Sequence, residues 1–283
     1  MDRPYNETCF KTSHNSYSIS VRKQLDAGVR GLEYDIHANQ ILELGDFEVY
    51  HLPDYADVAL GIDGNPKDLL LTNWLNLLKE WSDERNREHA PITLFIELKD
   101  SIIDENYELD ELYGIRMLNK IILDTLGPDY LYQYSDFHKN GFQWLSVNDL
   151  KGKIIIVLTS YWGGYWASNE GGFESRKKYL QDALESKNDV CFVAWIEDDK
   201  GENVQFVKDN STFWKCSLEY STEHFEENNI AQRATRVDYN KIGHEKHIKT
   251  NYKQNFASGY RANFLSTDYW YSKKYEKSFP WVD

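Results

Sequence analysis

The chain has 283 residues and a formal net charge of -14, with 46 acidic against 32 basic side chains. This charge argues against a nucleic-acid partner and against lasting adsorption to an anionic membrane, because both attract basic surfaces, but it leaves room for transient membrane contact. The sequence has no repeat, no linker and no apolar run long enough to span a bilayer, so we expect one domain covering 1–283.

Strand-like and helix-like segments alternate along the chain. Apolar, β-branched runs predict strands at 29–36, 92–98, 153–158, 190–195, 230–237 and 263–266. Apolar residues at helical spacing predict helices at 69–81, 109–126, 179–186 and 244–256. This alternation favours an α/β barrel. An open, doubly wound sheet is the alternative, but no glycine-rich phosphate loop follows the first predicted strand.

Cysteine usage and the first residues bear on the compartment. Three cysteines are too few for a disulfide framework, although one bond between Cys191 and Cys216 is compatible with the sequence. The first residues are polar and do not resemble a signal peptide. Either the protein is cytosolic or a leader has been removed. Aromatic side chains make up 15% of the chain, which we interpret as core packing, with sugar stacking around a cleft as the alternative.

Short patches in the first hundred residues carry the groups that a catalytic site needs. They are Ser13-His14-Asn15-Ser16-Tyr17, Glu33-Tyr34-Asp35, Tyr50-His51, and Glu97 with Lys99. Two imidazoles among three carboxylates and an amide suit a site that binds one hard cation through oxygen. The two histidines suit acid-base cleavage of a phosphodiester.

Strand geometry places these groups on common faces. Side chains alternate across a strand, so Glu33, Asp35 and His37 share one face, and Glu97 and Lys99 share one face of a second strand. Both sets lie near the carboxyl ends of their strands, where barrel sites are built. Burying several carboxylates together is costly unless a cation or a proton compensates, and a metal is the natural compensation.

Each patch also has a simpler interpretation. The two acids of the first strand could form the solvated face of an edge strand, and Glu97 with Lys99 could be a surface ion pair. His14 and His51 could be hydrogen-bonded structural histidines, and Asn15 a turn residue. All of these simpler interpretations must hold at once if there is no site, so we favour the site.

Several segments together resemble the calcium-dependent phosphatidylinositol-specific phospholipase C family, in its compact bacterial and fungal C1-like branch. The segments are Ser13-His14-Asn15-Ser16-Tyr17, residues 25–36, Val49-Tyr50-His51 and residues 95–100, with weaker likeness at 236–238 and 266–269. The chain departs from the family pattern at Ala234, where relatives often carry an arginine. The resemblance spans most of the chain and implies a distorted (β/α)8 TIM-type barrel.

The resemblance also implies roles for individual residues. His14 and His51 would be the catalytic histidines, and Lys99 would lie beside the phosphate. The implied ligands of Ca²⁺, with Mg²⁺ as the alternative, are Asn15, Glu33, Asp35 and Glu97. The remaining predicted substrate-binding residues are Arg236, Trp195 and Tyr269.

The reaction implied is attack by the inositol 2-hydroxyl on its own phosphate, which gives a cyclic phosphodiester. His14 would stabilise the phosphorane or take the hydroxyl proton, and His51 would protonate the departing alcohol. We therefore expect a monomeric, secreted or extracytoplasmic enzyme, with a cytoplasmic one as the alternative. Its substrate would be an inositol phospholipid or a soluble phosphodiester.

Two rival functions share the barrel. A glycerophosphodiester phosphodiesterase usually opens with His-Arg-Gly, whereas this chain has His14-Asn15-Ser16. A binding module that has lost catalysis normally lacks a catalytic histidine or a metal ligand, and none is missing from the predicted set.

Overall fold

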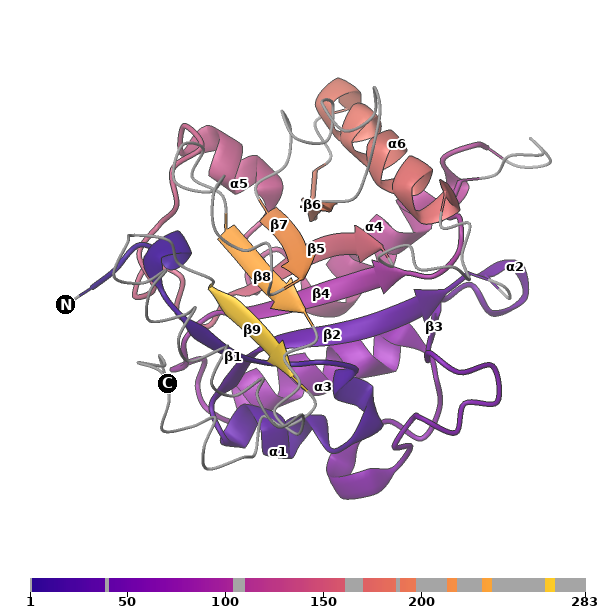
Figure 1. Ribbon diagram of the computed structural model, residues 1–283, viewed down its shortest axis with the longest axis horizontal. Helices are drawn as coiled ribbons and strands as arrows, with labels where there is room; N and C mark the ends of the chain where they lie inside the picture. The colour runs from indigo at the N-terminus through magenta and orange to yellow at the C-terminus, as the bar shows by residue number, and fades with distance from the viewer. Residues whose placement is uncertain are drawn as a thin grey trace.

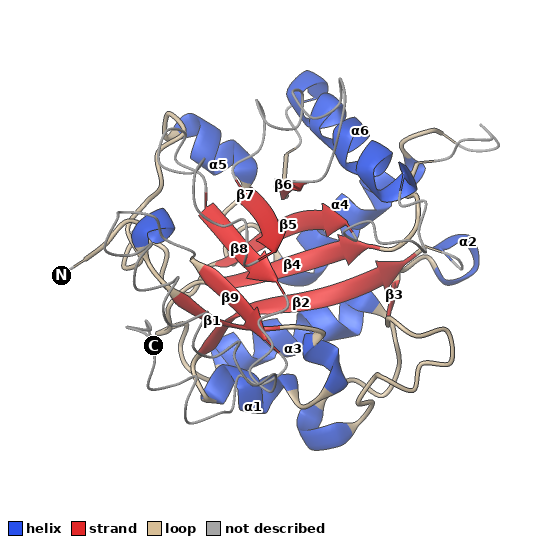
Figure 2. Cartoon of the chain, in the orientation of Figure 1, coloured by secondary structure: helices blue, strands red, loops and turns tan. Residues whose placement is uncertain are grey.

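The structure is a computed structural model that describes residues 2–38, 41–103, 110–160, 170–186, 189–196, 213–217, 231–235 and 263–267. The described residues form a mostly parallel α/β fold in which the strands lie together at the centre (Figure 1). Helices α1 and α3 lie on one side of the strands and α5 and α6 on the other (Figure 2).

The described parallel strands pair in a ring. In chain order they are β1 (Phe10–Ser13), β2 (Val29–His37), β4 (Ile92–Leu98), β5 (Ile154–Ser160), β6 (Phe192–Ile196), β7 (Phe213–Ser217), β8 (Ala231–Thr235) and β9 (Phe264–Thr267). Neighbours from β2 through to β9 pair in parallel, and β1 pairs with both β9 and β2. One short antiparallel strand, β3 (Glu48–Val49), extends from the carboxyl end of β2. This pairing is that of the predicted barrel.

The contact between β1 and β2 depends on a glycine. Gly31 lies opposite Thr12, and a Cβ atom at Gly31 would come within 2.4 Å of the Thr12 Oγ1 atom. Any larger residue would therefore push β1 away from β2. This close approach brings the turn after β1 next to the acidic side chains of β2.

Helices follow several of the strands. They are α1 (Val21–Asp26), α2 (Ile41–Leu44), α3 (Leu71–Asp83), α4 (Tyr113–Leu126), α5 (Tyr134–Lys139) and α6 (Glu170–Ser186). Short 3-10 turns occupy Tyr5–Glu7, Ser16–Ser18 and Ile62–Gly64. The Ser20 hydroxyl caps α1 by accepting the Lys23 N–H at 3.2 Å. α4 ends at Gly127, which has a positive φ of 78° and precedes Pro128.

Two layers of apolar side chains fill the described fold. The outer layer joins the helices to the strands and includes Leu32, Tyr34 and Ile36 of β2. The inner layer is aromatic and joins strands across the ring: the Phe95 and Phe264 ring centroids are 5.2 Å apart, as are those of Phe10 and Phe264. Core packing, rather than sugar stacking, therefore accounts for these interior aromatic residues.

The sequence predictions match most described elements. The strands predicted from 29, 92, 153, 190, 230 and 263 correspond to β2, β4, β5, β6, β8 and β9, and the helices predicted from 69, 109 and 179 correspond to α3, α4 and α6. The predicted helix at 244–256 lies outside the described residues. Strands β1, β3 and β7 and helices α1, α2 and α5 were not predicted, because each is short. In β1 and β7, lysine, serine or threonine also interrupts the apolar residues.

The register of β6 and β7 rules out a disulfide bond between Cys191 and Cys216. Ala194 lies opposite Phe213, while Cys191 precedes the first by three residues and Cys216 follows the second by three. At about 3.3 Å per residue the two cysteines are offset by about 20 Å, well beyond disulfide reach of about 7 Å. Cys191 is a free, buried thiol. Within the described ranges, no helix is long and apolar enough to cross a membrane.

Candidate active site

Three carboxylates meet at the carboxyl ends of β2 and β4. Glu33 and Asp35 lie on β2, and Asp35 pairs in register with Glu97 of β4. One oxygen from each of the three carboxylates lies within 4.8 Å of the others, and all three residues are buried. Side chains alternate along β4, so Phe95 and Glu97 share a face. Phe95 lies in the aromatic interior, and Glu97, two residues further along, lies near the carboxyl end of the strand.

Lys99 supplies a positive charge to this cluster. Its backbone N–H continues the pairing of β4 with β2 by donating to the Ile36 carbonyl oxygen at 3.0 Å. Its Nζ atom lies 2.6 Å from Glu97 Oε1 and 3.1 Å from Asp35 Oδ2. Burial alone would lower the pKa of Lys99, but the two carboxylates outweigh burial and raise it, so the lysine is charged. The structure thus places Lys99 directly against two of the predicted metal ligands.

The cluster fits a divalent cation by charge and by donor type. Three carboxylates and one ammonium leave two negative charges in a buried place among the described side chains. The Asp35 Oδ1 atom is buried and accepts no hydrogen bond within the described part of the chain. A buried carboxylate oxygen without a partner is costly, and a hard cation is the ligand that carboxylate oxygens prefer.

His51, in the segment that follows β3, contacts the same cluster. Its Nδ1 atom lies 2.8 Å from Asp35 Oδ2, and its side chain is 37% exposed while that of Asp35 is 2% exposed. The carboxylate holds a proton on Nδ1, which leaves Nε2 as the nitrogen that can exchange a proton with a substrate. The Asp57 carboxylate accepts the N–H groups of His51 at 3.2 Å and of Leu52 at 3.1 Å, which fixes the backbone here.

His14 and Asn15 reach the cluster from the turn after β1. The His14 Nε2 atom lies 3.8 Å from Glu33 Oε2, and the Asn15 N–H donates to that oxygen at 3.3 Å. Asn15 adopts the left-handed conformation with φ 43°, which asparagine tolerates better than most residues. The Ser16 hydroxyl accepts the Glu33 N–H at 2.8 Å and so fixes the turn to β2.

The structure therefore brings together seven of the predicted site residues. They are His14, Asn15, Glu33, Asp35, His51, Glu97 and Lys99. Arg236 and Tyr269 lie outside the described residues, and Trp195 is described only through its backbone in β6, so their substrate roles stay predictions.

Sequence reasoning assigned no role to three residues that shape the site. Ser16 accepts the N–H of Glu33 and Asp57 the N–H of His51, while Asp100 accepts the N–H of Ala38 at the end of β2. Ser16 lies within the patch Ser13-His14-Asn15-Ser16-Tyr17, and this position next to His14 and Asn15 is the only sign of its role in the sequence. Asp57 lies in a loop with no periodicity, where the sequence offers nothing to distinguish it from Asp54.

Several solved structures share this architecture. A calcium-dependent phosphoinositol-specific phospholipase C from Pseudomonas sp. is 17% identical, with a TM-score of 0.67 over 98% of this chain and 93% of that chain. A Ca²⁺-dependent phosphatidylinositol-specific phospholipase C from Streptomyces antibioticus is 17% identical, with a TM-score of 0.62 over 94% and 95%. A glycerophosphodiester phosphodiesterase from Parabacteroides distasonis is 12% identical, with a TM-score of 0.50 over 92% and 93%.

No family model and no curated protein matched the sequence. The likeness to the solved structures is one of fold, and it extends over nearly the whole of this chain. The fold that the sequence resemblance implied is thereby confirmed: this chain has the same barrel architecture as the three solved structures named above.

Proposed function

We propose that this protein is a metal-dependent phosphodiesterase of the phospholipase C type that cleaves inositol phosphodiesters. One observation carries the proposal. Two imidazoles, those of His14 and His51, are each set against a different member of one buried carboxylate trio. A structural histidine needs one hydrogen-bond partner, whereas two histidines around a common anionic cluster suit a general acid and a general base acting on one bound group.

The residues of the site have distinct tasks in this reaction. His51, with a proton held on Nδ1 by Asp35, uses Nε2 to protonate the departing alcohol. His14 lies beside Glu33, a different member of the trio, and takes the proton of the attacking hydroxyl or stabilises the phosphorane. Lys99 compensates part of the charge of Asp35 and Glu97, and its role beside the phosphate is the one that the sequence resemblance implies.

A divalent cation, with Ca²⁺ as our first choice and Mg²⁺ as the alternative, would be held by Glu33, Asp35, Glu97 and the side chain of Asn15. Bound there, it would lower the pKa of the attacking hydroxyl and neutralise a non-bridging phosphoryl oxygen. The attacking hydroxyl and the phosphorus belong to the same substrate molecule. The protein's own contribution is to align them, and this positioning lowers the barrier.

The phospholipase C neighbours of Pseudomonas and Streptomyces are described as acting on phosphoinositol or phosphatidylinositol with calcium, which supports this choice of substrate and metal. The second candidate is a glycerophosphodiester phosphodiesterase, because the enzyme of that name from Parabacteroides distasonis shares the fold. His14-Asn15-Ser16 in place of His-Arg-Gly makes it the weaker candidate. The extracytoplasmic location and the monomeric state stay predictions from the sequence.

Phosphorus NMR of the products distinguishes these candidates. We would incubate the protein with phosphatidylinositol, glycerophosphoinositol and glycerophosphocholine, each with calcium and with a chelator. An internal nucleophile gives a five-membered cyclic phosphate, whose signal lies far downfield of open esters, followed by slow opening to the monoester.

Each outcome of this experiment has one meaning. A cyclic phosphate that forms with calcium and not with chelator supports the proposal. Fast hydrolysis of glycerophosphocholine without any cyclic product supports the second candidate. Full activity in chelator excludes a metal requirement, and tight calcium binding without turnover of any substrate supports a binding module.

A further inference from the structure

His37, the last residue of β2, is fixed in place by Asp100. The His37 Nδ1 atom lies 2.9 Å from Asp100 Oδ2, and the same oxygen accepts the Ala38 N–H at 3.1 Å. Burial would raise the pKa of Asp100, but these two hydrogen bonds and the nearby charges outweigh burial and lower it, so Asp100 is ionised. The carboxylate therefore orients the imidazole and ends the strand at a defined place.

The imidazole of His37 in turn holds Tyr50. The two rings are stacked, with centroids 3.8 Å apart and planes 5° from parallel. On its other contacts, the Tyr50 ring meets Tyr55 edge-on at 4.7 Å, and the Tyr50 N–H donates to the Asp35 carbonyl oxygen at 3.1 Å. Tyr50 is buried, so its ring and backbone are both restrained.

Tyr50 is the link between this stack and His51. β3 ends at Val49, and the Tyr50 N–H bond to Asp35 extends its contact with β2 by one residue. His51 follows directly, so Tyr50 restrains the backbone on one side of His51 while Asp35 and Asp57 hold its ring and its N–H. The His37 Nε2 atom is buried and has no hydrogen-bond partner within the described ranges. The Tyr50 stack is therefore the contact through which the His37 ring acts on this segment.

We propose that His37, oriented by Asp100, is a positioning residue that holds Tyr50 and thereby sets the position of the His51 imidazole. The inference rests on the proposed function, in which His51 protonates the leaving alcohol. His37 acts through Tyr50 and touches no substrate. Because a misplacement of about 1 Å can cost up to 10²-fold in rate, the effect should fall on turnover and not on substrate binding.

Two near-isosteric variants separate the stack from the hydrogen bond. In His37→Asn the amide can keep the contact with Asp100, but the ring is lost; in His37→Phe the ring is kept and the contact is lost. We expect His37→Asn to lower kcat roughly tenfold with KM changed less than about threefold, and His37→Phe to lower kcat less than about threefold. The matched control for lost stability is Asp26→Asn. Asp26 lies far from His51 in the sequence, accepts the Trp81 Nε1–H and pairs with Arg85, so kcat should stay unchanged.

A second readout does not depend on activity. In protein labelled with ¹⁵N-histidine, the ring signals of His51 are identified by their loss in His51→Ala. His37→Asn should shift or broaden the His51 ring signals, while His37→Phe and Asp26→Asn should leave them in place. Unchanged His51 signals in His37→Asn, or a greater loss of kcat in His37→Phe than in His37→Asn, would overturn the positioning role.

The two hypotheses fail in different ways. If His51→Ala keeps full activity, the proposed function is wrong in its choice of acid. The displacement of the His51 ring in His37→Asn would still support the positioning role in that case. If His51→Ala is inactive and His37→Asn matches the wild type in both kcat and ring signals, the positioning role is wrong and the proposed function stands.

Discussion

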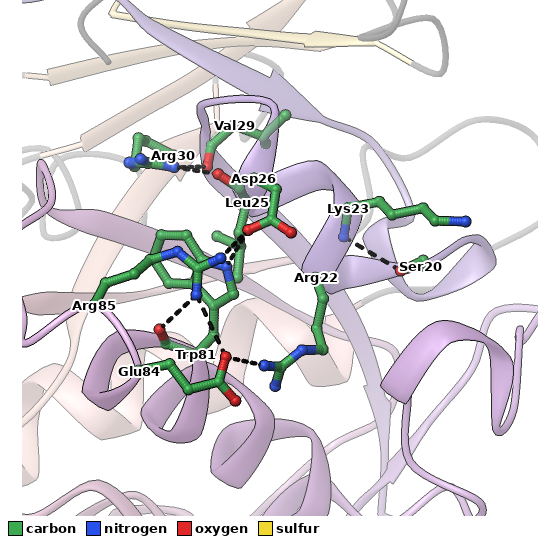
Figure 3. Close-up of polar contacts among 10 residues, drawn as sticks. All are labelled: Ser20, Arg22, Lys23, Leu25, Asp26, Val29, Arg30, Trp81, Glu84 and Arg85. Carbon is green, nitrogen blue, oxygen red and sulfur yellow. Dashed lines mark hydrogen bonds and ion pairs between the residues drawn. The ribbon is translucent and has the colours of Figure 1, made fainter.

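The two ends of β2 deal with charge in opposite ways. At the carboxyl end, Glu33 and Asp35 join Glu97 in a buried acidic cluster that Lys99 compensates only in part. At the amino end, Arg30 is buried beside the carboxyl end of α3, where cationic side chains gather around Trp81 (Figure 3). One strand therefore carries a negative site at one end and a positive structural cluster at the other.

The amino-end cluster is built around the indole of Trp81, near which two guanidinium groups lie. The Arg85 Cζ atom lies 4.1 Å and the Arg30 Cζ atom 5.2 Å from the Trp81 ring centroid. The Trp81 Nε1–H donates to Asp26 at 2.8 Å, and Arg85 pairs with the same carboxylate (Figure 3). Arg30 donates to the carbonyl oxygens of Leu25 at 2.8 Å and Val29 at 2.9 Å.

The two clusters differ in how far their charges are compensated. Each charge named in the amino-end cluster has a partner of opposite charge, a carbonyl oxygen or an aromatic face. At the carboxyl end, three carboxylates meet one ammonium, so negative charge is left over among the described residues. We therefore expect the first cluster to contribute to stability, and we propose that the second binds a cation.

The largest expected effect is on turnover at the carboxyl end. His14→Ala and His51→Ala should each lower kcat by roughly 10² or more, the usual contribution of a general acid or base. Both side chains are partly exposed and lie outside the apolar core, so unfolding in urea should shift little. Steady-state kinetics and urea titration of the same preparations check both statements. A variant that keeps near wild-type kcat shows that its histidine is structural.

At the amino end we expect the opposite: a large loss of stability with little change in turnover. Trp81 is 1% exposed, and Trp81→Ala should lower the free energy of unfolding by about 3–5 kcal/mol through the cavity and the lost contacts. The kcat of the folded fraction should stay within about twofold of the wild type, far from the 10²-fold loss expected for the histidines. Urea titration followed by far-UV circular dichroism measures the first quantity. A large loss of kcat in folded protein would mean that the two ends of β2 are coupled.

The sequence predicted the carboxyl end better than the amino end, for a physical reason. Glu33, Asp35 and Glu97 lie on strands, where a period of two assigns them to one face, and their types announce the chemistry. The amino-end cluster joins residues of α1, β2 and α3 that lie more than fifty positions apart, as Asp26 and Trp81 do. No periodicity within one segment reveals such a contact.

The same reasoning explains which parts of the fold were missed. β2 and β4 are long and apolar on their outer faces, so they were predicted. β1 has only four residues, one of them lysine, and is stabilised by contacts that the sequence does not show. The Lys11 ammonium donates to the Ala27 carbonyl oxygen at 3.1 Å, which permits its burial. Tertiary hydrogen bonds of this kind override the local preference of the residues.

A divalent cation should stabilise the protein through the carboxyl end alone. Calcium at 100 times its dissociation constant should add about 2.7 kcal/mol to the free energy of unfolding, because it binds the folded state only. Glu33→Gln should remove most of this gain without unfolding the metal-free protein, since it relieves the crowding of carboxylates. Trp81→Phe should keep the gain. Thermal unfolding with calcium and with chelator measures both, and an equal gain in Glu33→Gln would contradict the assignment of the ligand.

The smallest expected effect is a pH dependence that belongs to the amino end. His89 is buried, its Nδ1–H donates to the Ala90 carbonyl oxygen at 2.8 Å, and Nε2 lies 2.7 Å from the Ser82 hydroxyl. Burial lowers the pKa of His89 below its ordinary value, and the charges of Arg30 and Arg85 lower it further. The neutral ring is therefore the form that the folded protein prefers.

The sign follows from where each state takes up its proton. In the unfolded chain the histidine titrates near pH 6.5, whereas the folded protein resists protonation until a lower pH. The contribution of His89 to stability is thus complete above about pH 6.5 and is lost as the pH falls, by at most about 1.4 kcal/mol per pH unit. His89→Gln removes this titration, while all other titratable groups are the same in the two proteins. Urea titrations of both from pH 7.5 to pH 5 (about the range in which histidine titrates) therefore isolate the contribution of His89 to the pH dependence of stability. The wild type should lose stability more steeply than His89→Gln as the pH falls. Parallel curves would show that His89 takes up its proton as readily in the folded protein as in the unfolded chain.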